Sequence, residues 1–543
     1  MIKNTPTFKE FLILSFFVLI AVGVNLTKAV HIDDTAYLEM AKAILHNPFH
    51  PLSQETNWGN TSEPIFNINQ PLFIPFVYAL VLRSFGESEV ALHMFIGLCS
   101  ALAIFLFYML TNHFQIRHKL FLTGLFALGP SFLPGQDLMV DIPLMAFWLV
   151  FFLAIFSIKE ENHKKYLVAG LAVAIACLTK YISLTLLPIF IFAMLYRGHW
   201  KSIWSLGIPV IVLALWSWFN YIDFGAIHMF ERPTPDLNDI TFQMISYRMI
   251  TWIAGVGSVS PFAISFISLK RNDSAGRGVL LAALASGFAL SAFMILTNQT
   301  QFMAYWIIFF ITGAFVNGFI LLILYQNIMA AWQREDRNEF GQEIVLGLWI
   351  AGTITFIILF SPFIAIRHIF LVMPAVLLIL GRHLSKQGMI VSRDVISFAL
   401  TILLGVALAV SDYYYSDIYR VYAFKIREDL PREARIYQTG HWGWQWYSIK
   451  AGMIQYDTIK SRLRNGDYLV VPSGIFNQKI PARILPKLEE AQRLIIPAPA
   501  PTWIRTMNTN FKGGGYYGFE FPGSTPWLFS KAPFEFVIFQ FVE

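Results

Sequence analysis

Long apolar runs recur along this chain from residue 11 to residue 411, and they constrain the fold more than any other feature of the sequence. Of the 543 residues, 56% are hydrophobic and only 14% are charged. Soluble domains do not sustain apolar runs of this length and number. The sequence therefore predicts a multi-span α-helical membrane protein.

Thirteen apolar segments are candidate spans. They are residues 11–27, 88–110, 119–134, 138–158, 166–179, 182–196, 203–221, 244–269, 279–297, 301–328, 344–363, 368–381 and 395–411. The first has no small-residue cleavage site after it, so we expect a retained span and not a signal peptide. Residues 71–85 begin with Pro71 and carry Arg83, and we expect them to lie along the membrane surface.

The run from 166 to 196 needs a break. As a single helix it would be about 46 Å long, which exceeds a hydrocarbon core of about 30 Å. The length predicts two short helices that meet near Lys180.

Positive charge orients the chain. With the N-terminus in the cytoplasm, the loops assigned to that side carry most of the loop Lys and Arg residues, as the positive-inside rule requires. The first outer loop is then 28–87 and the C-terminus is outside. We expect a transmembrane domain over 1–411 and an extracytoplasmic domain over 412–543.

The tail after residue 411 has a different composition from the preceding part. It contains strand-like runs such as "DYLVVPSG" and "FEFVIFQFVE", a helix-like "DIYRVYAFKIRED" and turns rich in glycine and proline. Its length suits one small α/β domain.

Two adjacent carboxylates, Asp33 and Asp34, open the first outer loop. After them, Tyr37 and further apolar residues recur at helical spacing, which predicts an amphipathic helix along the interface. A simple interpretation is that Asp34 caps this helix. Capping does not account for Asp33.

A second acidic pair lies at the outer start of a later span, in "PGQDLMVDIPL". Asp137 and Asp141 are four residues apart, and we expect them to share one helix face. A helix N-terminus would favour Asp137. Asp141 lies one turn inside an apolar helix, where a carboxylate is costly unless it faces a polar cavity.

Cations are predicted at the same level. Lys180 falls at the junction of two short helices, a place where broken helices line binding cavities. Arg367 and His368 begin a later span from outside, and Arg248 lies just inside another. Each cation could instead snorkel to the headgroups. Together with the carboxylates, these cations put both signs of charge at the ends of helices that are distant in sequence.

Such a set suits transfer from a lipid-linked phosphate donor. A carboxylate can deprotonate an acceptor hydroxyl, and Lys and Arg can hold a departing phosphate. Composition and spacing equally allow a lipid or polysaccharide transporter (flippase), although charges remain at helix ends and no internal repeat is visible. A non-catalytic scaffold would leave Asp141 and Lys180 unexplained.

Four stretches, in order, resemble the polytopic C-type glycosyltransferases of the dolichyl-phosphate-mannose protein mannosyltransferase type, which include the aminoarabinose transferases. They are "DDTAYLEMAKAI", "DLMVDIPL", "LTKYISLTLLP" and "RHIFLVMPAVLLILG", and "GHWGWQWYSIKAG" resembles part of the outer domain of bacterial members. The resemblance covers about residues 8 to 411.

The resemblance implies roles for the acidic residues. The first acidic residue of the first outer loop corresponds to Asp33, as catalytic base or acceptor positioner, with Asp34 beside it. The acidic residue of the second outer loop corresponds to Asp141, with Asp137 nearby.

The resemblance also implies roles for the cations. The lysine of the "LTK" motif, near the donor phosphate, corresponds to Lys180. The basic-aromatic pair that opens a late span corresponds to Arg367 and His368. An aromatic hydroxyl is commoner at the second of these positions, so His368 departs from the pattern.

A further departure concerns metal. Where relatives often have a histidine or acidic residue before proline, this chain has Asn69, Gln70 and Pro71. This removes a strong metal ligand and leaves open whether a divalent metal is needed, although Asp33, Asp141 and His228 could form a weak site. We expect Asn69 and Gln70, with Tyr37 and His228, to line the active site.

Aromatic residues crowd the outer domain. Trp442 and Trp444 could stack on a sugar, and packing in the domain core is an equally direct interpretation.

The expected function is that of an inverting glycosyltransferase of a bacterial inner membrane. The expected donor is a polyprenyl-phosphate sugar that enters from the outer leaflet. The acceptor is a hydroxyl on lipid A, a protein or a cell-envelope glycan. Nothing in the sequence suggests a nucleic-acid partner.

Overall fold

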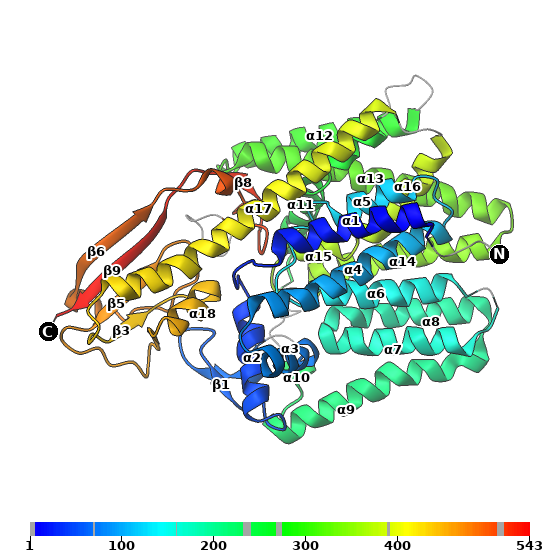
Figure 1. The fold of residues 1–543 in the computed structure, drawn as a ribbon. Helices are drawn as coiled ribbons and strands as arrows, with labels where there is room; N and C mark the ends of the chain where they lie inside the picture. Colours follow the sequence, from blue (N-terminus) through cyan, green and yellow to red (C-terminus); the bar gives the residue numbers. More distant parts are fainter. Residues whose placement is uncertain are drawn as a thin grey trace.

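The computed structural model describes residues 6–68, 71–158, 160–231, 240–267, 274–387, 391–507 and 515–542. A bundle of helices forms one part, and a sheet with two covering helices forms the other (Figure 1). The N-terminus lies at the end of the bundle remote from the sheet, and the C-terminus lies on the sheet.

Within these residues, seven helical stretches are long and apolar enough to cross a membrane. They are α1 (Phe8–Asn25), α4 (Glu89–His113), η3 with α9 (Trp200–Leu206 and Gly207–Phe224), α12 (Ser274–Leu296), α13 (Met303–Gln333), α14 (Arg337–Phe360) and α17 (Ser392–Asp429). Their flanks expose large apolar side chains, among them Leu19, Leu215 and Phe288. Such flanks suit contact with lipid and confirm the multi-span membrane fold.

Six further predicted spans contain shorter helices. These are α5 (Lys119–Ala127), α6 (Asp141–Phe156), α7 (His163–Thr179), α8 (Leu186–Arg197), α11 (Phe242–Ser258) and α16 (Met373–Gln387). The prediction of one helix over 119–134 is wrong, because α5 ends at Ala127 and a non-helical segment follows. Pro130 and Pro134 lack the amide hydrogens that helix continuation needs.

Short elements connect the bundle. They are α2 (Asp34–His46), α3 (Phe73–Phe85), α10 (His228–Glu231), α15 (Ile366–Phe370), η1 (Ile65–Asn67), η2 (Tyr181–Thr185), η5 (Pro261–Phe266) and the two-residue strands β1 (Glu55–Thr56) and β2 (Glu63–Pro64). The predicted helix after Asp33 is confirmed as α2. Most of α2 is buried, packed against α3 and against α18 of the C-terminal domain, and its place along the membrane interface stays a prediction.

The predicted break at Lys180 is confirmed. The helix α7 ends at Thr179, Lys180 is extended with φ −160° and ψ 129°, and η2 leads into α8. The lysine side chain therefore projects from the gap between two helices.

The C-terminal part is an α/β domain, as predicted. Its sheet has the order β4-β3-β5-β9-β6, with parallel pairing of β3 to β4 and β5 and antiparallel pairing of β9 to β5 and β6. The elements are β3 (Ile436–Gln438), α18 (Trp442–Lys450), β4 (Ile454–Gln455), β5 (Tyr468–Pro472), η6 (Leu485–Lys487), β6 (Leu488–Ile496), η7 (Ala500–Thr502), β7 (Ile504–Arg505), β8 (Leu528–Phe529) and β9 (Phe534–Phe541).

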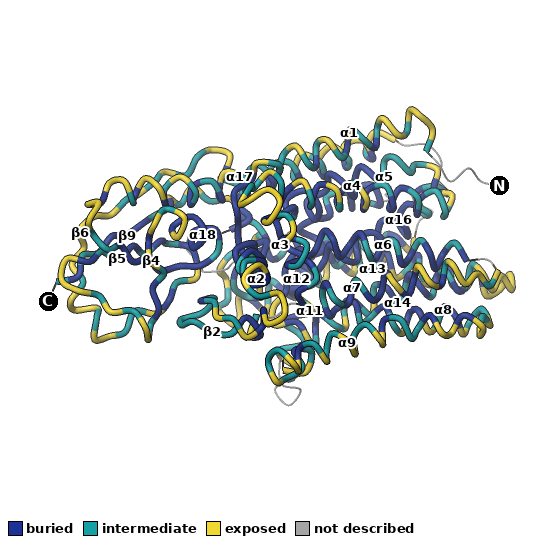
Figure 2. Tube along the Cα trace, turned by 60° about the horizontal axis from the view of Figure 1, so that its bottom comes forward, coloured by how far each residue is buried: buried dark blue, intermediate teal, exposed yellow. Residues whose placement is uncertain are grey.

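The two parts share one core. Buried side chains continue from the helix bundle into the sheet domain (Figure 2). The helix α17 runs through both parts, and the predicted division at residue 411 falls within it. The site described next lies where the parts meet.

Candidate functional site

Asp33 lies at the N-terminal end of α2, at the junction between the two parts. Its side chain caps no helix amide, and its Oδ2 accepts a hydrogen bond from Nη1 of Arg367 on α15 at 2.9 Å. The Asp33 side chain is 31% exposed, whereas that of Arg367 is 10% exposed. The preceding residue, Ile32, has a φ of 45°. A β-branched residue in this left-handed region is strained, so the fold holds Asp33 against a conformational cost.

The C-terminal domain holds the segment that carries Asp33. The amide of Val30 donates to the Tyr447 hydroxyl at 2.8 Å, and the Thr35 hydroxyl donates to the Trp442 carbonyl at 2.6 Å. A side chain at Gly443 would collide with the backbone of Val30, so only glycine permits this close approach. The helix α18 therefore fixes the chain on both sides of Asp33.

Asp34 is the first residue of α2 and is fully buried. Its Oδ2 accepts from the His31 amide at 2.9 Å, in the turn before the helix. The interpretation of Asp34 as the helix cap is therefore wrong, because Asp33 occupies the cap position. Burial, and secondly the nearby charge of Asp137, raise the pKa of Asp34 well above its usual range.

We expect Asp34→Asn to keep the fold and to be at least as stable as the wild type at neutral pH. Because the pKa of Asp34 is raised in the folded state, ionisation of its carboxyl opposes folding above the pKa of unfolded aspartate. Asparagine removes this opposition and can still accept from the His31 amide. Thermal unfolding from about pH 8 down to about pH 4 should show the variant's advantage shrinking as the pH falls. A variant that is much less stable at pH 8 would contradict a neutral Asp34.

Asp141 and Lys180 form a second ion pair, at 2.8 Å. Asp141 begins α6, and Lys180 projects from the break after α7. Both side chains are largely buried, and Oδ2 of Asp141 has no hydrogen-bond partner among the described residues. A buried carboxylate oxygen without a partner is costly, which is typical of a site that awaits a ligand.

The two ion pairs lie close to each other, around Tyr37 of α2. Burial raises the pKa of Tyr37, the carboxylates of Asp141 and Asp33 raise it further, and Arg367 lowers it. The charge of Asp141 also acts on Arg367. The structure thus brings together five of the predicted site residues, from four separate elements.

The remaining predicted cations lie in other surroundings. His368 is buried with its ring stacked on Phe363 at 5.8 Å between centroids. Nη1 of Arg248 donates to the carbonyls of Ile358 and Ser361, both at 2.7 Å, at the end of α14. These bonds give Arg248 a structural role, because they satisfy carbonyls that the helix end leaves unpaired.

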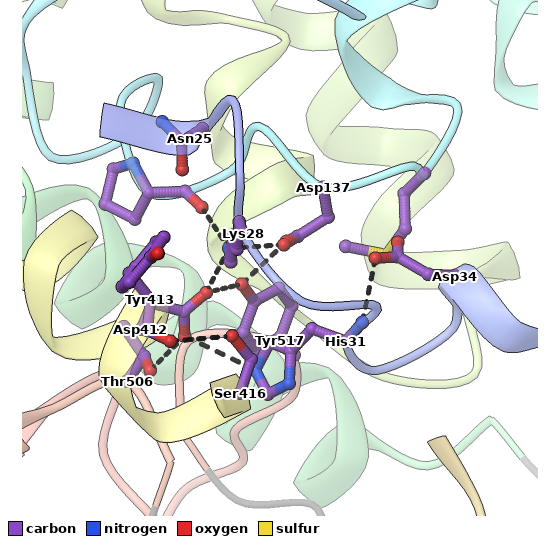
Figure 3. A network of polar contacts seen from close by, with 12 residues as sticks. Asn25, Lys28, His31, Asp34, Asp137, Asp412, Tyr413, Ser416, Thr506 and Tyr517 are labelled. Atoms are coloured by element: carbon purple, nitrogen blue, oxygen red, sulfur yellow. Dashed lines mark hydrogen bonds and ion pairs between the residues drawn. The ribbon is translucent and has the colours of Figure 1, made fainter. Parts of the chain in front are cut away.

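A buried network that the sequence did not predict lies beside Asp34 (Figure 3). The ammonium of Lys28 pairs with Asp137 and, at 2.5 Å, with Asp412 of α17. The Tyr517 hydroxyl binds Asp137 at 2.6 Å and Asp412 at 2.5 Å. Burial alone would lower the pKa of Lys28, but the two carboxylates raise it above its usual range. The network joins the segment after α1, the segment before α6 and the C-terminal domain.

The structure around this network corrects the prediction made for Asp137 and shows two further residues at Asp412. Asp137 does not share a helix face with Asp141, because it lies in the non-helical segment before α6. Thr506 donates to Asp412, and Nε2 of His31 is 3.4 Å from the same carboxylate. The sequence signal for this network was slight: Lys28 and Asp412 each follow directly after an apolar run.

The sequence model of the dolichyl-phosphate-mannose-protein mannosyltransferase family matches residues 69–221. This match confirms the predicted resemblance. The chain is thus similar to this family over residues 69–221. The matched residues include Asp137, Asp141 and Lys180, whereas Asp33 and Arg367 lie outside them. No curated protein sequence matches the chain significantly.

Three solved structures are similar to this chain at low identity. The protein O-mannosyltransferase Pmt1–Pmt2 complex of S. cerevisiae, bound to the sugar donor, is 19% identical, with a TM-score of 0.32 over 41% of this chain and 35% of that chain. ArnT from Cupriavidus metallidurans, bound to undecaprenyl phosphate, is 13% identical, with a TM-score of 0.42 over 89% and 96%.

The third structure is the oligosaccharyltransferase of Archaeoglobus fulgidus. It is 13% identical, with a TM-score of 0.47 over 82% of this chain and 63% of that chain. The chain thus spans about a third of the yeast chain's length and less than two thirds of the archaeal one. At these scores no residue role is transferred from the three structures.

The described residues do not form the predicted weak metal site. Among the described residues, no three His, Cys, Asp or Glu side chains are grouped so that they could hold a metal ion. His228 instead binds the carbonyl of Ile68 at 2.9 Å and the hydroxyl of Tyr181 at 3.0 Å. The predicted lining residues Asn69 and Gln70 lie outside the described residues.

The tryptophans of the outer domain have mainly structural roles. Trp444 is fully buried, donates to the Thr439 carbonyl at 2.8 Å and packs on Phe536, so its predicted sugar stacking is wrong. Trp442 is half-buried with a φ of 64°, and its carbonyl holds Thr35. Stacking of a sugar on the Trp442 ring remains a prediction.

Proposed function

We propose that this glycosyltransferase moves a sugar from a polyprenyl-phosphate donor to an acceptor hydroxyl with inversion at the anomeric carbon. The observation that carries the proposal is the pair of adjacent carboxylate–cation contacts, Asp33 with Arg367 and Asp141 with Lys180. The family match, to enzymes named for a dolichyl-phosphate sugar, supports a lipid-phosphate donor.

Asp33 is the proposed catalytic base. Of the four carboxylates predicted for the site it is the most exposed, whereas Asp34, Asp137 and Asp141 are buried. An acceptor hydroxyl can therefore reach it from the aqueous side. Asp33 takes the hydroxyl proton as the oxygen attacks the anomeric carbon, and the bond from that carbon to the phosphate oxygen breaks with its electrons on the phosphate.

Arg367 and Lys180 are the proposed phosphate ligands. Without donor, each guanidinium or ammonium group is held by a carboxylate. A donor phosphate that binds Arg367 competes with Asp33 for this cation and frees the carboxylate to act as a base. Both cations then stabilise the charge that grows on the leaving phosphate. Asp141 orients Lys180.

The proposed location is a bacterial inner membrane, with multiple spans, the N-terminus in the cytoplasm and the C-terminal domain in the periplasm. The bias of Lys and Arg among the loops supports this orientation. Lipid A, a protein or a cell-envelope glycan would supply the acceptor hydroxyl. His368 and Asp34 are buried, lie next to Arg367 and Asp33 in the sequence and would help to position these two residues.

Replacing Lys180 with methionine should lower the turnover number about 100-fold, because one cation at a developing phosphate charge is lost. Lys180→Arg should recover part of the rate. Steady-state kinetics with a labelled donor measures both. Arg420→Met is the matched control, since Arg420 is an ion-paired cation at the same junction, bound to Glu89 and Asp417. Equal losses in the two methionine variants would point to a general charge effect.

A donor screen tests the function as a whole. The purified protein is offered a panel of radiolabelled polyprenyl-phosphate sugars with membrane extract as acceptor source, and both binding and loss of label from the lipid are measured. Loss of label from one donor, absent with Asp33→Asn, is the expected result. If no donor is bound or cleaved, transport of a lipid or polysaccharide becomes the better explanation.

A further inference from the structure

A cavity of about 590 Å³ opens at the end of the bundle that is remote from the C-terminal domain. It lies between the end of α8 and the start of α14, near the end where the N-terminus lies (Figure 1). The proposed catalytic residues lie at the opposite end of these helices. This cavity is therefore separate from the sugar-transfer site.

The polar wall of the cavity is cationic. Arg197, His199, Arg337 and Asn338 line it, and no carboxylate is among its described lining residues. The guanidinium group of Arg197 contacts the Tyr166 hydroxyl, but its Nη1 is buried and has no hydrogen-bond partner among the described residues. A buried guanidinium nitrogen without an acceptor favours an anion at this place.

Arg337 presents a second guanidinium group to the same cavity. Its Cζ lies 5.7 Å from the ring centroid of Tyr196, so the ring supports the plane of the group. The neighbouring acid Glu339 is already bound by Arg334 and Arg382. Two planar guanidinium groups around one cavity match the oxygens of a phosphate better than those of a single carboxylate.

The other wall of the cavity is apolar and continues onto the lipid-facing surface. Phe192, Leu195 and Val345 line it, and Leu195 and Ile191 of α8 are exposed on the bundle flank. A ligand that places its charged group on the arginines can therefore extend an apolar chain along α8.

Exposed tryptophans mark the membrane–water boundary at this level. Trp200 and Trp204 follow α8 directly, and both are exposed. Trp332 is also exposed and lines an adjoining cavity of about 500 Å³, which shares Tyr196 and Arg337 with the first and also has Glu335 and Asp336 in its wall. Tryptophan is enriched at the depth of the lipid headgroups, so the arginines lie where headgroup phosphates are found.

We propose that this cavity binds the phosphate headgroup of an anionic membrane lipid, with Arg197 and Arg337 as its ligands and the lipid tail along α8. Free inorganic phosphate has the same binding chemistry. The apolar wall and the tryptophans favour the lipid as the source.

Native mass spectrometry of the full-length protein in detergent tests the proposal. Phosphatidylglycerol or phosphatidylcholine is titrated in, with and without excess inorganic phosphate. We expect phosphatidylglycerol to bind about 10-fold more tightly, which corresponds to one charge-assisted contact. Arg197→Gln with Arg337→Gln should remove this preference, and Arg337→Gln alone should weaken it.

Arg334→Gln is the matched control, because Arg334 lies three residues before Arg337, is 62% exposed and does not line the cavity. It should keep the preference for phosphatidylglycerol. An unchanged preference in the double variant, or none in the wild type, would overturn the proposal. Displacement of the lipid by inorganic phosphate would overturn the assignment to a lipid and identify a soluble phosphate ligand. Size-exclusion chromatography confirms that the variants are folded.

Discussion

Asp33→Asn is expected to lower the turnover number by about 100- to 10,000-fold, the range for loss of a positioned general base. The substitution keeps the size of the side chain and a hydrogen-bond acceptor for Arg367. Donor binding should therefore be retained, or strengthened because the carboxylate that competes for Arg367 is gone. Single-turnover transfer and donor binding, measured on the same preparation, separate the two effects.

Asp417→Asn is a closely matched control for this experiment. Asp417 is also 31% exposed and also pairs with an arginine, Arg420, at 2.5 Å. It should transfer sugar at close to the wild-type rate. Asp33 would lose the role of base if its asparagine variant turned over as the wild type does, or if both variants lost activity equally.

Lys28→Met is expected to destabilise the protein by about 3–5 kcal/mol, the cost of removing one partner from a buried ion pair. The side chains of Lys28, Asp137 and Asp412 are fully buried, so the loss of the ammonium leaves two carboxylates without their counter-ion. Since methionine fills a similar volume, the effect reports charge more than packing. The thermal unfolding midpoint in detergent measures it.

Lys42→Met provides the comparison for this effect. Lys42 also contacts two carboxylates, Glu39 and Glu87, but its side chain is 39% exposed. Its replacement should cost about 1 kcal/mol or less. Adding Asp412→Asn to Lys28→Met should recover part of the lost stability, because it removes one of the two stranded charges. Equal midpoints for Lys28→Met and Lys42→Met would contradict a buried network that needs its cation.

Local sequence signals predicted the elements that carry the site. The spacing of apolar residues after Asp34 predicted α2, and the length limit set by the membrane predicted the break at Lys180. The resemblance then assigned Asp33, Asp141 and Arg367 to one site, and the structure places them together. These predictions succeeded because helical periodicity and span length depend on neighbouring residues alone.

Long-range partners could not be predicted in the same way. Lys28 and Asp412 are 384 residues apart, and no local pattern indicates that they meet. The helix face expected for Asp137 and Asp141 was wrong because spacing was read without the effect of Pro134 on the backbone. Trp444 is buried because it packs on Phe536 of the sheet, and the composition of the sequence does not show where this sheet lies.

The helix α17 fixes how the C-terminal domain is rotated relative to the helix bundle. Its 38 residues form one uninterrupted rod, about 57 Å long, from the far end of the bundle to the sheet domain. Each residue added to such a rod turns everything beyond it by about 100° and advances it by about 1.5 Å. A single alanine inserted before Asp412 would therefore rotate the sheet domain by about 100° relative to the segment that carries Asp33. The number of residues in α17 therefore sets the rotation of the sheet domain relative to the bundle, and with it the orientation of Asp33.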